Sequence, residues 1–386
     1  MIVKFKLLFS MTAGAVAAAV AAPVQAQADS PPPYPASAYS VFLPYINAPE
    51  PKARARTPRL VMSFGGRPVR VTMDTGSTGI VVSADAIPGE RGLPGRPGKV
   101  TYTSSGRVMH GRWVRTPVFI RGAGESALAV RPIEVLAVTR MTCLAHARNC
   151  TPERRPAGVA MMGVGFGREY NLQPEGTPDK NPFLNAAWPP DAAHQVVRGY
   201  VVTRDGVHVG LTQQSTQGSV QYAKLDPDPA IPGEWQGVPA CIKVDERSPA
   251  ACGRGLIDTG VTGMFVTLPP ALVDHRDTLP RGSRLTIDFP RSSSAGRVAD
   301  TSPVSSTQRD GPPRAAVANA PVEPSPANPA ARYTINAWDT ISPMTPSGIV
   351  INITRPTPFV NTGVRFLEGY DVLYDADRGF VGFRPR

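Results

Sequence analysis

The chain has 386 residues and a net charge of +11, and 41% of its residues are hydrophobic. Its 43 prolines make up about 11% of the residues (43/386), about twice the usual share, and proline interrupts helices. The composition therefore excludes a helical bundle or a coiled coil. It favours a β-rich protein with irregular insertions.

An export signal is predicted at residues 1–28. Lys4 and Lys6 precede an apolar run over residues 7–22, and the small residues Ala26 and Ala28 flank Gln27 in a typical cleavage pattern. The run is shorter than the ~20 apolar residues that span a bilayer, and no later stretch reaches that length. We expect an exported protein, periplasmic or secreted, with no transmembrane segment after cleavage.

Residues 29–57 are predicted to form a Pro-rich, basic linker or a short propeptide. The segment has three consecutive prolines at 31–33 and the basic side chains of Lys52, Arg54 and Arg56. A flexible linker is the favoured interpretation, because Pro-rich polar stretches usually serve that purpose. A propeptide would instead use the basic side chains to shield acidic groups of the folded protein.

Short apolar runs separated by Gly and Pro predict β-strands through the rest of the chain. In the first half, strands are expected at 60–64, 69–73, 80–83, 133–138 and 159–164, with a hairpin over 100–120 that turns at 104–106. In the second half they are expected at 199–202, 207–211, 219–223 and 241–244, and again from 333 to 383. This division predicts an N-terminal β-lobe at 58–198 and a C-terminal β-lobe at 199–386.

One segment of the second half differs in composition. Residues 291–332 contain no Leu, Ile, Met, Phe, Tyr or Trp, and seven of them are Pro. Such a segment cannot bury enough apolar surface to offset the entropy lost on ordering. We predict a disordered insertion here, inside the C-terminal lobe.

Four cysteines lie in two close pairs, at 143 and 150 and at 241 and 252. Export to an oxidising compartment favours disulfides, and local pairing of Cys143 with Cys150 and of Cys241 with Cys252 is the simplest of the three possible arrangements. A metal site that uses His146 is the alternative, but no C-x-x-C or H-x-x-x-H spacing accompanies it.

The positive charge does not by itself indicate a partner. The arginines are scattered among Pro and Gly and do not follow one helix or strand face, so a solvated exterior is favoured over a nucleic-acid interface. Binding to an anionic envelope remains a weaker alternative. The chain also lacks the G-x-S-x-G, H-E-x-x-H and G-x-x-x-x-G-K-[ST] motifs of other hydrolases and nucleotide-binding proteins.

An internal repeat is the most informative feature of the sequence. Residues 71–83 reappear in altered form at 255–267, and each copy is an apolar strand, then Asp-Thr-Gly-x-Thr-Gly, then a second apolar strand. The acids of the two copies, Asp74 and Asp258, lie 184 positions apart (258 − 74). Two related lobes would therefore each bring one carboxylate on a tight turn to a central cleft.

Two adjacent carboxylates have a defined chemistry. They cannot both ionise cheaply, so one keeps a proton. The ionised member can act as a base on water while the protonated member polarises a carbonyl group, the arrangement for which aspartic proteases are the standard example. A single Asp-Thr-Gly is common in turns, but two copies in matched apolar frames favour catalysis over turn capping.

At this point the sequence resembles the pepsin-like aspartic protease family, over most of the chain from about residue 60 to 383. Met161, Met162 and Gly163 match the apolar-apolar-Gly strand behind the first catalytic loop of that family, and 361–363 is the looser second match. The pattern of 366–375 and the run 379–383 are similar to the C-terminal strands of the family. Cys241 and Cys252 resemble a disulfide hairpin of the second lobe.

The resemblance implies an all-β, bilobal fold and a role for specific residues. These are the catalytic pair Asp74 and Asp258, the loop-bracing residues Thr75, Gly76, Thr259 and Gly260, the carboxylate-orienting residues Ser77 and Thr262, and the flap residue Tyr102. It implies an endopeptidase that acts on polypeptides as a monomer, with no cofactor, metal or nucleic acid.

Three departures from the family pattern leave an alternative open. Val261 stands where the second loop usually has a hydroxyl residue, which is why Thr262 is the candidate to orient Asp258. No Trp follows the first turn, and Tyr102 lies only 28 residues beyond Asp74 (102 − 74). The alternative is an inactive or weakly active binding or inhibitory protein on the same bilobal frame.

Overall fold

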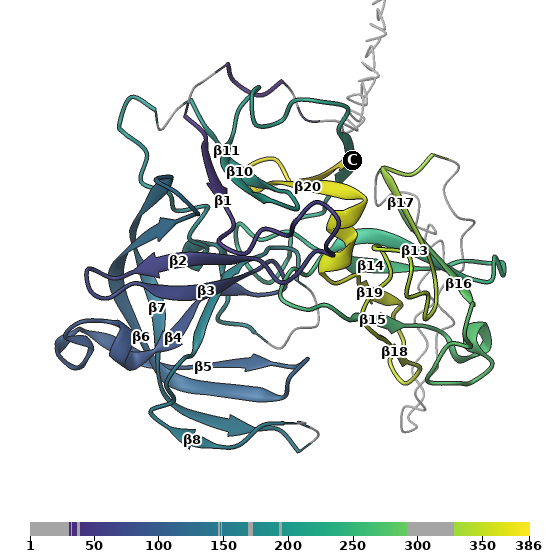
Figure 1. The fold of residues 1–386 in the computed structure, drawn as a ribbon, viewed down its shortest axis with the longest axis horizontal. Helices are drawn as coiled ribbons and strands as arrows, with labels where there is room; N and C mark the ends of the chain where they lie inside the picture. The colour runs from purple at the N-terminus through teal and green to yellow at the C-terminus, as the bar shows by residue number, and fades with distance from the viewer. Residues whose placement is uncertain are drawn as a thin grey trace, which may run out of the picture.

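The computed structural model of the protein describes residues 31, 33–36, 39–145, 147, 149–168, 173–192, 195–291 and 328–386, and the strands in these ranges form three sheets. The helical turns in these ranges are all of the 3-10 type. Figure 1 shows one group of strands on the left, a second on the right, and strands of the third sheet above and between them. The predicted all-β, bilobal fold is confirmed.

The first half of the chain forms an eight-stranded sheet. In spatial order its strands are β5 (Gly95–Tyr102), β6 (Arg107–Arg121), β2 (Arg59–Ser63), β3 (Val69–Asp74), β9 (Ala160–Val164), β4 (Thr78–Ser83), β7 (Ala127–Cys143) and β8 (Glu153–Arg154). The predicted hairpin is formed by β5 and β6, which pair from Gly95 with Val114 to Tyr102 with Arg107. Alternation along β6 buries Val114, Val118 and Ile120, which fixes the face that meets the core.

The second half forms a seven-stranded sheet with a matching order. Its strands are β17 (Ala331–Asn336), β16 (Arg284–Phe289), β13 (Val238–Val244), β14 (Ala251–Leu256), β19 (Phe359–Asn361), β15 (Met264–Thr267) and β18 (Ile349–Asn352). The central order β3-β9-β4 of the first sheet corresponds to β14-β19-β15 of the second. The sequence repeat is therefore a repeat of topology.

A third, six-stranded sheet draws on both ends of the chain. Its strands are β1 (Val41–Pro44), β11 (Gly206–Leu211), β10 (Val197–Val202), β20 (Tyr370–Asp375), β21 (Phe380–Pro385) and β12 (Gln221–Lys224). The predicted C-terminal lobe, 199–386, thus supplies most of this shared sheet as well as the seven-stranded one. The remaining short elements are the 3-10 turns η1 (Ala84–Ala86), η2 (Glu90–Gly92), η3 (Pro178–Lys180), η4 (Pro270–Val273) and η6 (Val364–Glu368).

The prediction of a linker at 29–57 needs correction. Residues 41–44 form β1, which pairs with β11 from Val41 opposite Val209 to Pro44 opposite Gly206. Leu43 of this strand is fully buried, so the segment contributes to the core. The high proline content masked a strand only four residues long, because prolines are tolerated at strand ends and edges.

The basic stretch of the same segment lies against the C-terminal part of the chain. The Ala55 N–H donates to Glu368 of η6, and the Arg54 guanidinium donates to the carbonyl of Thr340. Arg204 adds a hydrogen bond from its Nη2 to the Glu50 carbonyl at 3.0 Å. These contacts do not support the interpretation of 52–56 as a shield for the acidic pair.

Both predicted disulfides are present. Cys143 and Cys150 close a loop at the end of β7, and Cys241 and Cys252 face each other across the β13–β14 pair. The predicted signal peptide, His146 and residues 292–327 of the predicted insertion lie outside the described residues. Within the described ranges, no helix has the length and apolar character needed to cross a bilayer.

Candidate active site

Each aspartate of the repeat lies on a turn whose two arms lie on either side of a third strand. Asp74 ends β3, which runs parallel to β9, and β4 returns antiparallel on the other side of β9. In the second copy β14 and β15 flank β19 in the same way, with Asp258 two residues beyond β14. Neighbouring strands are about 4.8 Å apart, so the two arms of each turn, with one strand between them, are about 10 Å apart.

Glycines allow the central strands to pass this close. An ideal Cβ at Gly163, which lies opposite Asp74 in the β3–β9 pairing, would lie 2.7 Å from the Thr78 nitrogen. Gly363 has φ +67°, and a Cβ there would overlap the Gly263 carbonyl. The matches at 161–163 and 361–363 therefore share one steric requirement, which is a glycine directly under the turn.

The threonines of the two turns bind each other's backbone. Thr75 Oγ1 donates to the Ile257 carbonyl at 2.5 Å and accepts from the Thr259 N–H at 3.0 Å. Thr259 Oγ1 donates to the Met73 carbonyl at 2.9 Å and accepts from the Thr75 N–H at 3.1 Å. Both side chains are buried, so these hydrogen bonds satisfy groups that water cannot reach and lock the turns together. The predicted bracing role of Thr75 and Thr259 matches this geometry.

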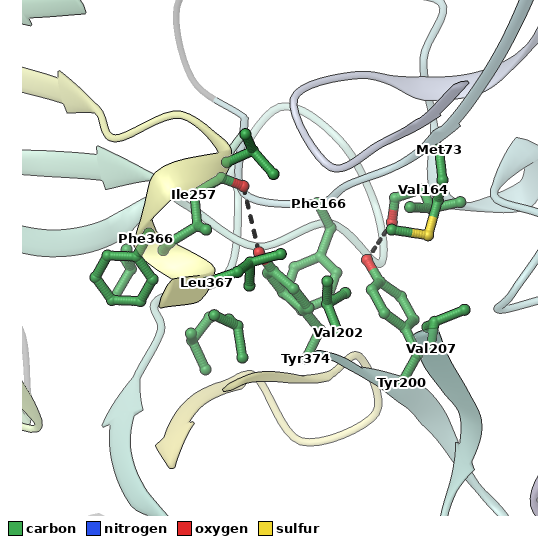
Figure 2. Packing of buried hydrophobic residues seen from close by; sticks show 14 of the residues in the cluster. Met73, Val164, Phe166, Tyr200, Val202, Val207, Ile257, Phe366, Leu367 and Tyr374 are labelled. Atoms are coloured by element: carbon green, nitrogen blue, oxygen red, sulfur yellow. Dashed lines mark hydrogen bonds between the residues drawn. The ribbon is translucent and has the colours of Figure 1, made fainter. Parts of the chain in front are cut away.

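An aromatic cluster below the braces joins the two halves. Tyr374 of β20 packs against Phe166 and Tyr200, with ring centroids 5.3 and 5.0 Å away. Its hydroxyl donates to the carbonyl of Ile257, the residue before Asp258, at 3.4 Å (Figure 2). Met73, the residue before Asp74, lies in the same cluster (Figure 2). The residues that precede the two aspartates thus pack in the same aromatic cluster.

The first carboxylate is held as the sequence predicts. The Gly76 N–H donates to Asp74 Oδ1 at 2.7 Å, and Ser77 Oγ donates to Asp74 Oδ2 at 2.5 Å. Asp74 is 5% exposed and Asp258 7%. Both oxygens of this buried carboxyl group therefore have a hydrogen-bond donor.

The second carboxylate is held differently from the prediction. The Gly260 N–H donates to Asp258 Oδ1 at 2.8 Å, which repeats the arrangement at Gly76. The other oxygen, Oδ2, accepts from Asn361 Nδ2 at 2.6 Å. Thr262, predicted to orient Asp258, is exposed at its hydroxyl and pairs with Ser347 Oγ at 2.9 Å. Asn361 on β19 takes the place that sequence reasoning gave to Thr262.

The two carboxyl groups meet across the pseudosymmetric turns. An ideal Cβ on Gly76 would overlap the carboxyl group of Asp258, and one on Gly260 would overlap that of Asp74. Each glycine therefore occupies the position where the opposite acid needs room. Each residue of Asp-Thr-Gly therefore has a separate role. The Asp supplies the carboxyl group, the Thr binds the backbone of the opposite turn, and the Gly leaves space for the opposite carboxyl group.

Burial and charge set the protonation of the pair. Burial raises the pKa of Asp258 well above its usual range, and the negative charge of Asp74 raises it further. The hydrogen bond from Asn361 opposes this shift without cancelling it. Asp258 is thus the member of the pair that keeps the proton.

The raised pKa of Asp258 predicts a pH-dependent effect of Asp258→Asn on stability. Below about pH 4 the Asp258 carboxyl group is protonated in both the folded and the unfolded state, so its ionisation does not change the free energy of unfolding. As the pH rises, the unfolded state ionises first and the wild type loses stability, about 1.4 kcal/mol for each unit of the shift. Asparagine does not ionise, so we expect the melting temperature of the variant to exceed that of the wild type by a margin that grows towards pH 7.

Thermal unfolding at several pH values checks this expectation. Asp277→Asn is a matched control, because Asp277 lies exposed in the loop after η4. A margin for Asp258→Asn that stays constant or reverses as the pH rises would contradict the assigned proton.

The predicted flap residue Tyr102 lies close to the pair. It ends β5, and burial and then the negative charge of Asp74 raise its pKa well above the usual range, with the Ser77 hydroxyl acting in the opposite direction. Its side chain therefore reaches the Asp74 side of the pair from the tip of the β5–β6 hairpin.

A tryptophan that the sequence analysis overlooked supports this hairpin. Trp113 of β6 is fully buried, and an ideal Cβ on Gly79 of the first turn would be 3.6 Å from its ring. Its Nε1 donates to Glu175 Oε2 at 2.8 Å. No Trp follows the first turn in sequence, yet Trp113 reaches that place from another strand. Alternation along β6 buries the even-numbered residues from 114 to 120, so it predicts neither the burial of Trp113 nor its packing on β4.

No other ligand set was found in the described ranges: no three or more His, Cys, Asp and Glu side chains there gather as a metal site would require. Searches of protein-family models and of curated protein sequences gave no match to the chain.

Proposed function

We propose that the protein is an aspartic endopeptidase that hydrolyses peptide bonds with a water molecule activated between Asp74 and Asp258. The observation that carries the proposal is the facing of two buried carboxyl groups across braced turns, each filling the space left by the opposite glycine. The shared proton, held by Asp258, gives one base and one acid in the same site.

The reaction follows from these charge states. Ionised Asp74 takes a proton from the water as its oxygen attacks the peptide carbonyl, while the proton of Asp258 is donated to the carbonyl oxygen. The tetrahedral intermediate collapses when Asp74 passes its proton to the amide nitrogen, which leaves as an amine, and one hydroxyl of the intermediate returns a proton to Asp258. Water is consumed, a carboxylic acid and an amine are formed, and no covalent bond to the protein is required.

The rest of the site fits a polypeptide substrate. Tyr102 lies at the tip of the β5–β6 hairpin beside Asp74, where a hairpin can cover an extended chain. Two disulfides are compatible with action outside the cytoplasm, and we propose an exported, monomeric enzyme.

Digestion of a reduced, unfolded protein between about pH 3 and pH 7 tests the proposal. We expect cleavage that is favoured at acidic pH, because Asp258 must hold its proton, and that is blocked by a statine-type inhibitor. Residues from 29 onward should be kept, because β1 belongs to the core. A folded protein that leaves the substrate intact at every pH would overturn the proposal and favour a binding protein.

A further inference from the structure

A buried guanidinium lies behind the Asp74 turn. Arg168 follows β9, and its side chain is 4% exposed. An ideal Cβ on Gly165 would overlap the Thr75 carbonyl and come within 3.2 Å of Arg168 Cδ. One on Gly176 would lie 2.9 Å from the Thr78 carbonyl and 3.0 Å from Arg168 Nη2. Arg168 therefore fills the space directly beneath the backbone of the catalytic turn.

The counter-charge of Arg168 comes from the other half of the chain. Glu234, in the loop between β12 and β13, is 3% exposed and places Oε2 4.0 Å from Arg168 Nη2. Its other oxygen accepts from the N–H groups of Gly167 and Trp235, both at 3.0 Å. A buried pair at this distance is costly and is a poor device for stability alone, which suggests another role.

Arg168 also reaches the flap hairpin. Its Nη1 donates to Gln173 Oε1 at 3.3 Å, and Gln173 Nε2 donates to the Thr101 carbonyl at 3.1 Å. Thr101 directly precedes Tyr102 on β5. One buried side chain is thus linked to the catalytic turn, to the flap strand and to the second half of the protein.

We propose that Arg168 is a positioning residue that, anchored by Glu234 of the second half, sets the flap strand relative to the catalytic turn. The inference rests on the proposed peptidase and assigns to that site a control element that the Asp-Thr-Gly repeat does not contain.

The charged and titratable groups around Arg168 come from both halves of the protein. Burial lowers the pKa of Arg168, and the charges of Glu234, Asp74 and Tyr200 raise it, in that order of importance. Arg168 therefore interacts with the catalytic turn and with the second half of the chain.

Three variants test the role. Arg168→Met removes the cation, and Glu234→Gln removes the anion that anchors it while keeping an acceptor for the two N–H groups. Gln173→Leu cuts only the link to β5. Arg115→Met, on the exposed face of β6, is the control for loss of an arginine.

The kcat and KM for cleavage of a fluorogenic peptide are then measured separately, with circular dichroism on the same samples. Gln173→Leu should raise KM about threefold to tenfold, the effect of one lost hydrogen bond, and leave kcat unchanged. Arg168→Met should raise KM at least as much and also lower kcat, because it removes support from the catalytic turn, and Glu234→Gln should act in the same direction to a smaller extent. A purely structural residue would lower the folded fraction without changing KM, so folded variants with an unchanged KM overturn the proposal.

Two further arms keep the test decisive. If a single variant does not fold, the double variant Arg168→Met with Glu234→Gln replaces it, and its KM must rise. If the folded wild type cleaves nothing, the peptidase itself is wrong, and amide hydrogen exchange then tests the positioning role alone. Exchange at 74–78 and in β5 should speed up in Arg168→Met, and in β5 alone in Gln173→Leu. Unchanged exchange overturns the positioning role.

Discussion

Replacing Asp74 by Asn is expected to lower kcat/KM for peptide cleavage by about 10²–10⁴-fold, the usual contribution of a general base. The carboxylate accepts hydrogen bonds from the Gly76 N–H and from Ser77 Oγ, and an amide can retain only part of this arrangement. The variant keeps the volume of the side chain and the Thr75–Thr259 braces, so the fold should persist. The measurement is a fluorogenic peptide assay with circular dichroism on the same sample.

Because the two aspartates act as one catalytic unit, we also expect their substitutions to have non-additive effects on activity. Asp258→Asn alone and the double variant should lose about as much activity as Asp74→Asn alone, because effects within one catalytic unit are not additive. Asp277→Asn on the exposed loop should retain full activity. Cleavage that survives in a folded Asp74→Asn protein would show that another group performs the chemistry.

Gly76→Ala should lower kcat about 10²-fold while the protein remains folded. The new methyl group would occupy the position of the Asp258 carboxyl group, which is the flexible end of a side chain and can rotate away. Folding is therefore affected less than geometry, and a misplacement of about 1 Å at a reacting group can cost 10² in rate. The kinetic constants and the melting temperature of the variant are measured together.

Gly92→Ala is the matched control for this substitution. Gly92 ends η2, has no heavy atom within 4 Å of an added Cβ, and does not have a positive φ. It should keep both activity and stability. Full activity in Gly76→Ala would mean that the two acids do not need the closeness described above.

The parts of the site that could be predicted from sequence are those encoded locally. Asp74, its donors Gly76 and Ser77, and the second turn with Asp258 and Gly260 lie within a few residues of each other, so the repeat itself contains their geometry. The strand pattern likewise indicated the β-rich halves, because alternation and turn residues are local signals.

Asn361 could not be assigned, because its role depends on strand order. It is 103 residues from Asp258 in the chain and reaches the carboxylate only because β19 lies between β14 and β15. In the sequence it was a polar residue at a position where an apolar one was expected. The nearer Thr262 was preferred because it lies on the turn, yet its hydroxyl points to Ser347.

Strand β1 and the Arg168–Glu234 pair were missed for the same reason. Strand β1 is stabilised by its pairing with β11, more than 160 residues away, and the sequence of 41–44 does not indicate this partner. Arg168 and Glu234 look like ordinary polar residues in Gly- and Pro-rich segments, and only the packing of the two halves buries them together.

The most direct test of the account is the pH dependence of kcat/KM for the wild type on a peptide substrate. A pair with an ionised Asp74 and a protonated Asp258 predicts a bell-shaped profile, with an acidic limb for loss of the base and a basic limb for loss of the acid. The basic limb should lie well above the usual range of an aspartate, because burial and the charge of Asp74 raise the pKa of Asp258. A rate that is independent of pH between about 3 and 8, or that rises steadily towards alkaline pH, would contradict the shared proton and with it the proposed mechanism.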